Sequence, residues 1–149
     1  MAYTPIVQQA DLATHIYAEI LEEITRSDNN LIERSITEAI ATAKSYLSRY
    51  DLTALFGSQA DGTSATYTDD YLIRIIKDLT CWYIIRLANP NLNREQYRQV
   101  YEDTIKTLEQ IQKGIITPQG WPFYVPESTT PQPGNAISWK GNTKRNTHL

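Results

Sequence analysis

The stretch that most constrains the fold is the second half of a predicted helix at about residues 69–88. It reads LTCWYIIRL over residues 79–87 and is apolar nearly all round. A helix without a polar face is buried on several sides. In a chain of 149 residues, few other helices are available to cover it. The pattern predicts either the central helix of an all-α bundle or a helix that partly faces a neighbouring subunit.

Two amphipathic helices are predicted on either side of this segment. The first begins at Asn30, whose side chain is a candidate cap with Glu33 returning the hydrogen bond, and its apolar residues recur every three or four positions up to Tyr50. The second runs from Asn93 to Gly114 and carries i,i+4 Glu–Lys pairs on a solvated face.

Shorter helical pieces complete the pattern. ADLATHIY and AEILEEITR precede residue 30, the first with Asp11 as its expected cap. DLTALFG adds a turn closed by Gly57, and Thr68 is the expected cap of the 69–88 helix. The sequence therefore predicts an all-α protein: a small bundle of about four to five helices over residues 1–114, followed by an extended C-terminal arm over residues 115–149.

The arm is unusual because it combines prolines with large apolar side chains. Five of the seven prolines fall between positions 118 and 133, among Trp121, Phe123, Tyr124, Ile137 and Trp139. Ordering about 35 residues costs several tens of kcal/mol, whereas burying one aromatic side chain returns at most roughly 4–6 kcal/mol. The arm therefore needs contacts along its length, which favours docking on other subunits or another protein. Folding back on its own helices is the alternative, most plausible for residues 115–125.

Charge is divided between the body and the arm. Beyond Gly114 there are three cations, Lys140, Lys144 and Arg145, against the single acid Glu127, so the arm is basic while the rest of the chain is acidic. A pI near 5.4 argues against a protein that coats nucleic acid non-specifically. The WKGNTKR segment could nevertheless touch phosphates or stack on a base.

No pattern of catalytic or ligand-binding residues emerges. The sequence has no phosphate-binding glycine loop, no Cys/His metal pair and no nucleophile motif. The lone Cys81 lies in an apolar run that favours a small buried hydrophobe, and His15 with Glu19 is weak as a metal site. We expect no enzymatic activity, no catalytic, metal or cofactor-binding residues and no cofactor. The absence of a signal-like or membrane-spanning segment predicts a soluble, intracellular type of protein without a membrane partner.

The order of the helices resembles a known family. After SDNN comes the long IERSITEAIATAKSYLSRYDL helix, then the apolar YLIRIIKDLTCWYIIRL helix and the tyrosine-rich REQYRQVYEDTIKTLEQIQKG helix. This order, over roughly residues 9–120, is similar to that of the small helical head–tail connector, or head-completion, proteins of tailed bacteriophages and Mu-like prophages. The long proline- and tryptophan-containing arm departs from a minimal connector.

The resemblance implies a virion protein at the head–tail junction, assembled in the host cytoplasm. It implies a homo-oligomeric ring, commonly of twelve subunits, that binds the portal protein and tail or second connector proteins. DNA would pass through the channel of this ring without sequence-specific binding. Partner-interface candidates are then the arm residues Trp121, Phe123, Tyr124, Ile137, Trp139, Lys140, Lys144 and Arg145. The alternative is a helical binding or regulatory module whose basic, aromatic tail engages another protein or nucleic acid.

Overall fold

The computed structural model describes residues 2–87 and 94–126. This part of the chain contains six helices: η1 (Gln9–Thr14), α1 (Ala18–Thr25), α2 (Asn29–Tyr46), α3 (Leu52–Phe56), α4 (Asp70–Ile85) and α5 (Arg94–Gln112). Among these residues, extended backbone pairs only at two isolated bridges, Tyr50 with Phe123 and Ser58 with Thr63. The predicted all-α class is confirmed.

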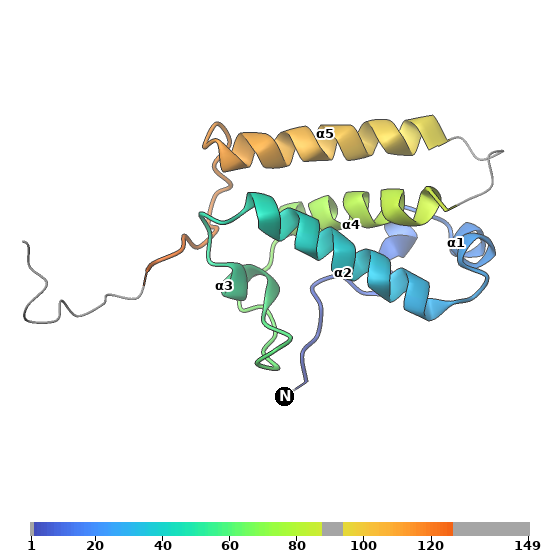
Figure 1. Ribbon diagram of the computed structural model, residues 1–149, viewed down its shortest axis with the longest axis horizontal. Coiled ribbons are helices and arrows are strands. Elements are labelled where there is room, and N and C mark those ends of the chain that lie inside the picture. Colours follow the sequence, from blue (N-terminus) through green and yellow to red (C-terminus); the bar gives the residue numbers. More distant parts are fainter. Residues whose placement is uncertain (1, 88–93, 127–149) are drawn as a thin grey trace, which may run out of the picture.

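Helix α4 is the centre of the bundle. It contacts η1, α1, α2 and α5, and its contact with α2 is the most extensive between any two helices. Figure 1 shows α5 lying along α4, with α2 crossing in front of it. Nine of the sixteen residues of α4 are buried, which matches a helix without a continuous polar face. Of the two arrangements that its sequence allowed, the central helix is therefore the one observed.

The core lies where α2, α4 and α5 meet, and apolar stripes at helical spacing supply it. From α2 the buried side chains include Ile32, Ile36, Ala39, Ile40 and Ala43, and from α5 they include Leu108 and Ile111. The N-terminal segment adds Val7, Leu12 and Ile16 to the same core, and its helix η1 contacts α4.

Two predicted helix caps were wrong by one or two residues. The cap of α2 is Asp28, whose carboxylate accepts from the Asn30 N–H at 3.0 Å, so Asn30 lies inside the helix. The cap of α4 is Asp69 and not Thr68, since the Asp69 carboxylate accepts from the Leu72 N–H at 2.8 Å. Asp, Asn and Thr all make favourable caps, so runs of such residues leave the starting position open.

Two shorter elements show how the local sequence sets their ends. The Asp11 carboxylate accepts from the Gln8 N–H at 2.8 Å, so Asp11 lies in the first turn of η1, and the prediction that Asp11 caps this helix was also wrong. Helix α3 does end at Gly57, where φ is 75°. A Cβ atom at Gly57 would lie 2.5 Å from the Thr63 carbonyl oxygen, so both the backbone angle and the close approach of the 58–64 loop require glycine.

Candidate partner-binding surface

The segment after α5 turns back onto the bundle. Gly114, with φ at 78°, ends the helix, and the N–H groups of Ile115 and Ile116 both donate to the Gln110 carbonyl oxygen at 2.9 and 3.2 Å. These two bonds satisfy the Gln110 carbonyl group at the end of the helix, as in other helices that end at a glycine. The chain then passes from the end of α5 towards α3, as Figure 1 shows. A second glycine, Gly120 with φ at 84°, precedes Trp121.

Trp121 is buried in the bundle, with 3% of its surface exposed. Its indole N–H donates to the Asp69 carboxylate at 2.6 Å. Its ring meets the Tyr50 ring edge-on, with centroids 5.4 Å apart, and lies tilted at 6.1 Å from the Tyr71 ring. A buried indole N–H needs an acceptor, and a carboxylate is a strong one. Trp121 therefore joins the C-terminal segment to the start of α4.

The next residues pair with the end of the α2–α3 connection. The Asp51 N–H donates to the Pro122 carbonyl and the Tyr124 N–H donates to the Arg49 carbonyl, both at 2.9 Å. Between these bonds, the Phe123 ring stacks on the Tyr50 ring with centroids 5.1 Å apart. Residues 122–124 are thus held by backbone hydrogen bonds as well as by ring contacts.

Beyond Trp121 the apolar side chains face solvent. Phe123 is 50% exposed, Tyr124 61% and Val125 80%. We call these three consecutive residues the arm-root patch. One exposed apolar side chain is ordinary, whereas three in succession, next to backbone hydrogen bonds at residues 122 and 124, form a surface suited to a protein partner.

The predicted interface residues therefore divide into three groups. Trp121 packs against its own chain and is 3% exposed, and its contact with a partner stays a prediction. Phe123 and Tyr124 are exposed, and their contact with a partner stays a prediction. Five predicted residues lie outside the described part of the chain: Ile137, Trp139, Lys140, Lys144 and Arg145. For residues 115–124, the alternative of folding back on the helices is the one observed.

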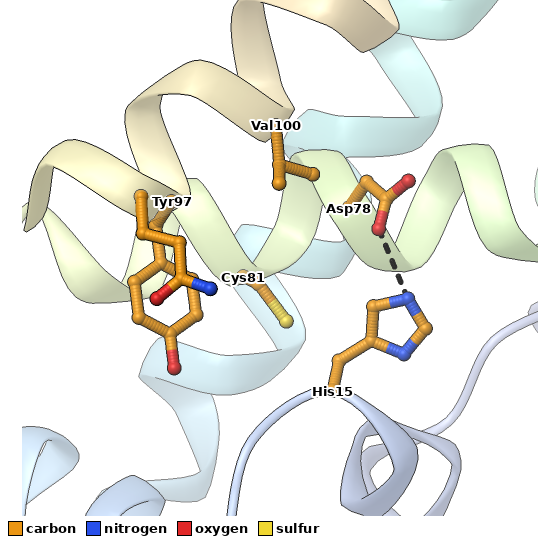
Figure 2. Close-up of a pocket in the computed structure, with 6 residues that line it drawn as sticks. His15, Asp78, Cys81, Tyr97 and Val100 are labelled. Carbon is orange, nitrogen blue, oxygen red and sulfur yellow. Dashed lines mark ion pairs between the residues drawn. The ribbon is translucent and has the colours of Figure 1, made fainter.

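A polar cluster lies on a different face of α4 (Figure 2). The His15 imidazole points from the segment after η1 to Asp78 of α4, with Nε2 3.0 Å from the carboxylate oxygen. The other His15 nitrogen lies 2.9 Å from the Thr14 hydroxyl. Burial raises the pKa of the Asp78 carboxyl, and the neighbouring His15 and Arg74 side chains act in the opposite direction.

This cluster borders a pocket of about 220 Å³, lined in part by Cys81, Tyr97 and Val100. A histidine paired with an acid supplies two of the three members of a nucleophilic triad, so the thiol of Cys81 decides whether the site has covalent chemistry. Burial raises the pKa of that thiol to about 12. Because the thiolate is the reactive form, Cys81 is inert at neutral pH. The contact between His15 and Asp78 joins the N-terminal segment to α4.

Neither a metal site nor a membrane span is found in the described residues. No three or more His, Cys, Asp or Glu side chains gather in this part of the chain so as to hold a metal ion. None of the helices in residues 2–87 and 94–126 is both long and apolar enough to cross a bilayer.

Sequence reasoning missed the residues that seat the arm. The sequence pattern places Tyr50 on the apolar stripe of the predicted helix that begins at Asn30, and Asp69 at the start of the predicted 69–88 helix. In the structure Tyr50 follows α2, which ends at Tyr46, and Asp69 caps α4. Neither position indicates a contact with a segment more than fifty residues away. The same holds for His15, which the sequence analysis considered only with Glu19 as a weak metal site and which pairs with Asp78 in the structure.

Comparison with known proteins gives one match. A family model described as "Bacteriophage Mu, Gp36" matches residues 7–120, from the buried Val7 in the N-terminal segment to the residue before Trp121. No curated protein and no solved structure matches the chain. The matched region covers well over half of the sequence and contains all six helices described above. The chain therefore belongs to the bacteriophage Mu Gp36 family, as a Mu-like phage protein.

Proposed function

We propose that this protein is a structural subunit of the phage virion that forms a connector ring between head and tail. Membership of a Mu-like phage family supports a structural or assembly role. The resemblance to head–tail connectors adds the finer expectation of a ring, commonly of twelve subunits, docked on the portal protein. Tail proteins or a second connector would bind its opposite side.

The arm-root patch is the observation that carries this proposal. It presents Phe123, Tyr124 and Val125 to solvent at the point where the described chain ends, with 23 further residues to follow. Those residues include Ile137 and Trp139, which add further apolar side chains to the arm. An assembly protein uses such a surface to hold its neighbours, because burial of aromatic side chains supplies much of the energy of association.

The charge of the chain fits a subunit that surrounds DNA without binding it tightly. Up to Gly114 the sequence has 11 basic and 16 acidic residues. Net negative charge repels the phosphate backbone and keeps non-specific affinity low. DNA could then move through a channel lined by such subunits. The three cations of the arm, Lys140, Lys144 and Arg145, would contact acidic protein surfaces.

A second function is favoured by the composition of the arm alone. Trp139, Lys140, Lys144 and Arg145 combine an aromatic ring with three cations, which suits single-stranded nucleic acid or an acidic protein. The chain would then be a helical binding or regulatory module. Retention on DNA at low salt, lost as salt is raised, separates this function from the connector.

The test is the mass of the assembly in solution. Light scattering on the purified protein, alone and with portal complex, should give a closed ring of many copies, on the portal if not alone. Truncation after Pro126 keeps every contact of the described chain, so this variant should retain its helical circular dichroism and lose assembly. A truncated protein that still forms the ring would remove residues 127–149 from the interface.

Point variants test the arm-root patch separately. Phe123→Ser and Tyr124→Ser should weaken assembly while leaving the body folded, because both side chains are half exposed or more. Tyr17→Ser is the matched control, since Tyr17 is 75% exposed and caps α1, which lies at the opposite end of the bundle in Figure 1. Equal losses in the control and in the patch variants would show that the patch has no special role.

A further inference from the structure

We propose that the hydrogen bond between Trp121 and Asp69 is a latch that positions the arm-root patch for its partner. The inference rests on the proposed function for the patch, and it assigns to Asp69 a role beyond the start of α4. Asp69 is a positioning residue in this scheme: it touches no partner and acts through Trp121.

The two carboxylate oxygens of Asp69 have different tasks. Oδ1 accepts from the Leu72 N–H at 2.8 Å and caps α4. Oδ2 accepts from the Trp121 indole N–H at 2.6 Å and lies 3.4 Å from the Tyr67 hydroxyl, which also donates to it. One side chain therefore joins the first turn of the central helix to the root of the arm. An N-cap alone needs only one acceptor, so the second oxygen is available for the arm.

Tyr50 transmits the position of Trp121 to the patch. The Tyr50 ring is 2% exposed, and it contacts Trp121 edge-on at 5.4 Å and Phe123 by stacking at 5.1 Å. Trp121 and Phe123 are two residues apart, and side chains two residues apart on an extended backbone lie on the same face of it. Both therefore point to the same side, and seating Trp121 places Phe123 on Tyr50.

A fixed patch binds better than a moving one. Association with a mobile segment must include the loss of conformational entropy, and a segment already held in its bound arrangement avoids most of that cost. The latch also fixes the position of residues 122–126, to which the rest of the arm is joined. The local concentration of the arm at a neighbouring site depends on this starting point.

Asp69→Asn separates the cap from the latch. Asparagine caps helices about as well as aspartate, but it has one acceptor oxygen instead of two, and the NH2 that replaces the second oxygen cannot accept from an indole N–H. Trp121→Phe makes the complementary change, because it keeps a ring and removes the donor. Asp28→Asn is the matched control: Asp28 caps α2 through the Asn30 N–H and has no contact with the arm among the hydrogen bonds described.

Hydrogen exchange of the Tyr124 amide, followed by NMR on the full chain, reports the seating of the arm because this N–H donates to the Arg49 carbonyl. In Asp69→Asn and Trp121→Phe, exchange should become about tenfold to a hundredfold faster, the loss expected for a hydrogen bond to a charged acceptor. The Leu72 amide should keep its protection in both, and Asp28→Asn should leave the Tyr124 rate unchanged. Unchanged Tyr124 exchange in both latch variants would overturn the latch.

Assembly with the portal gives the second readout. The protein concentration at half-assembly should rise at least tenfold in both latch variants at a temperature where all variants are folded. Faster Tyr124 exchange with unchanged assembly would overturn the positioning role. A wild-type chain that never assembles would instead contradict the proposed connector function, and the exchange rates would still decide whether the latch exists.

Discussion

The ring of Phe123 stacks on the ring of Tyr50, with centroids 5.1 Å apart and planes inclined by 19°. This contact joins the C-terminal segment to the end of the α2–α3 connection, and the two backbone hydrogen bonds of residues 122 and 124 flank it. Tyr50 is buried and Phe123 is half exposed, so the stack lies at the boundary between the core and the surface.

This boundary predicts unequal costs for two alanine substitutions. Trp121→Ala should lower the free energy of unfolding by about 3–5 kcal/mol, since it removes a large buried side chain and leaves a cavity. Phe123→Ala should cost about 1–2 kcal/mol, because only half of that ring is removed from solvent. Urea denaturation followed by circular dichroism measures both. Equal costs would mean that Trp121 is not seated in the core.

The two glycines at helix ends predict a second pair of unequal effects. Both have positive φ, and a Cβ at Gly57 would meet the backbone oxygen of Thr63 at 2.5 Å, whereas at Gly114 it would meet the Arg49 guanidinium at 2.6 Å. A flexible side chain can move away and a backbone atom in a hydrogen-bonded turn cannot. Gly114→Ala should cost about 1–2 kcal/mol for the backbone angle, and Gly57→Ala should cost more. Thermal unfolding of the two variants side by side tests this order.

Cys81 should be unreactive in the folded protein. Burial raises the pKa of its thiol to about 12, so at pH 8 almost none of it is thiolate. Iodoacetamide should therefore label the chain only when urea unfolds it, as mass spectrometry would detect. Rapid labelling in buffer would contradict the buried position of Cys81 and, with it, the packing of α4 against its neighbours.

Asp78 predicts a dependence of stability on pH. Its pKa is raised in the folded protein by burial, so the folded state binds a proton more readily than the unfolded state. The contribution of this group to stability therefore increases as the pH falls from above the raised value towards the ordinary value for aspartate, and it is smallest at neutral pH.

Asp78→Asn should remove that increase while keeping an acceptor for His15. Unfolding measured at several pH values for the wild type and the variant isolates this contribution. The control is Glu95→Gln, because Glu95 is an exposed acid paired with Arg98 on the surface of α5. A wild-type and an Asp78→Asn profile that run parallel would contradict the raised pKa.

The sequence predicts helices far better than it predicts contacts between distant segments. The stripe from Ile32 to Tyr50 has a 3.6-residue period and predicts α2, although the helix itself ends at Tyr46. The run near Trp82 is apolar nearly all round, and this signal predicts the central place of α4. The predicted caps, Asn30 and Thr68, differ from the observed caps, Asp28 and Asp69, because all four are favourable capping residues.

The seating of the arm has no comparable local signal. Trp121 stands among prolines, where no helical or strand period exists, and its partners Tyr50 and Asp69 each have a sufficient local explanation. An aromatic residue in a proline-rich segment indicates that something must cover it. Only the packing shows that its own chain covers Trp121, while Tyr124 remains exposed.

The mass of the complex formed with the portal tests the central claim most directly. Size-exclusion chromatography with light scattering should show wild-type protein adding to the portal as a ring of many copies, and Phe123→Ser and Tyr124→Ser losing that mass while Tyr17→Ser retains it. A wild-type chain that stays monomeric at high concentration and adds no mass to the portal would contradict the connector function.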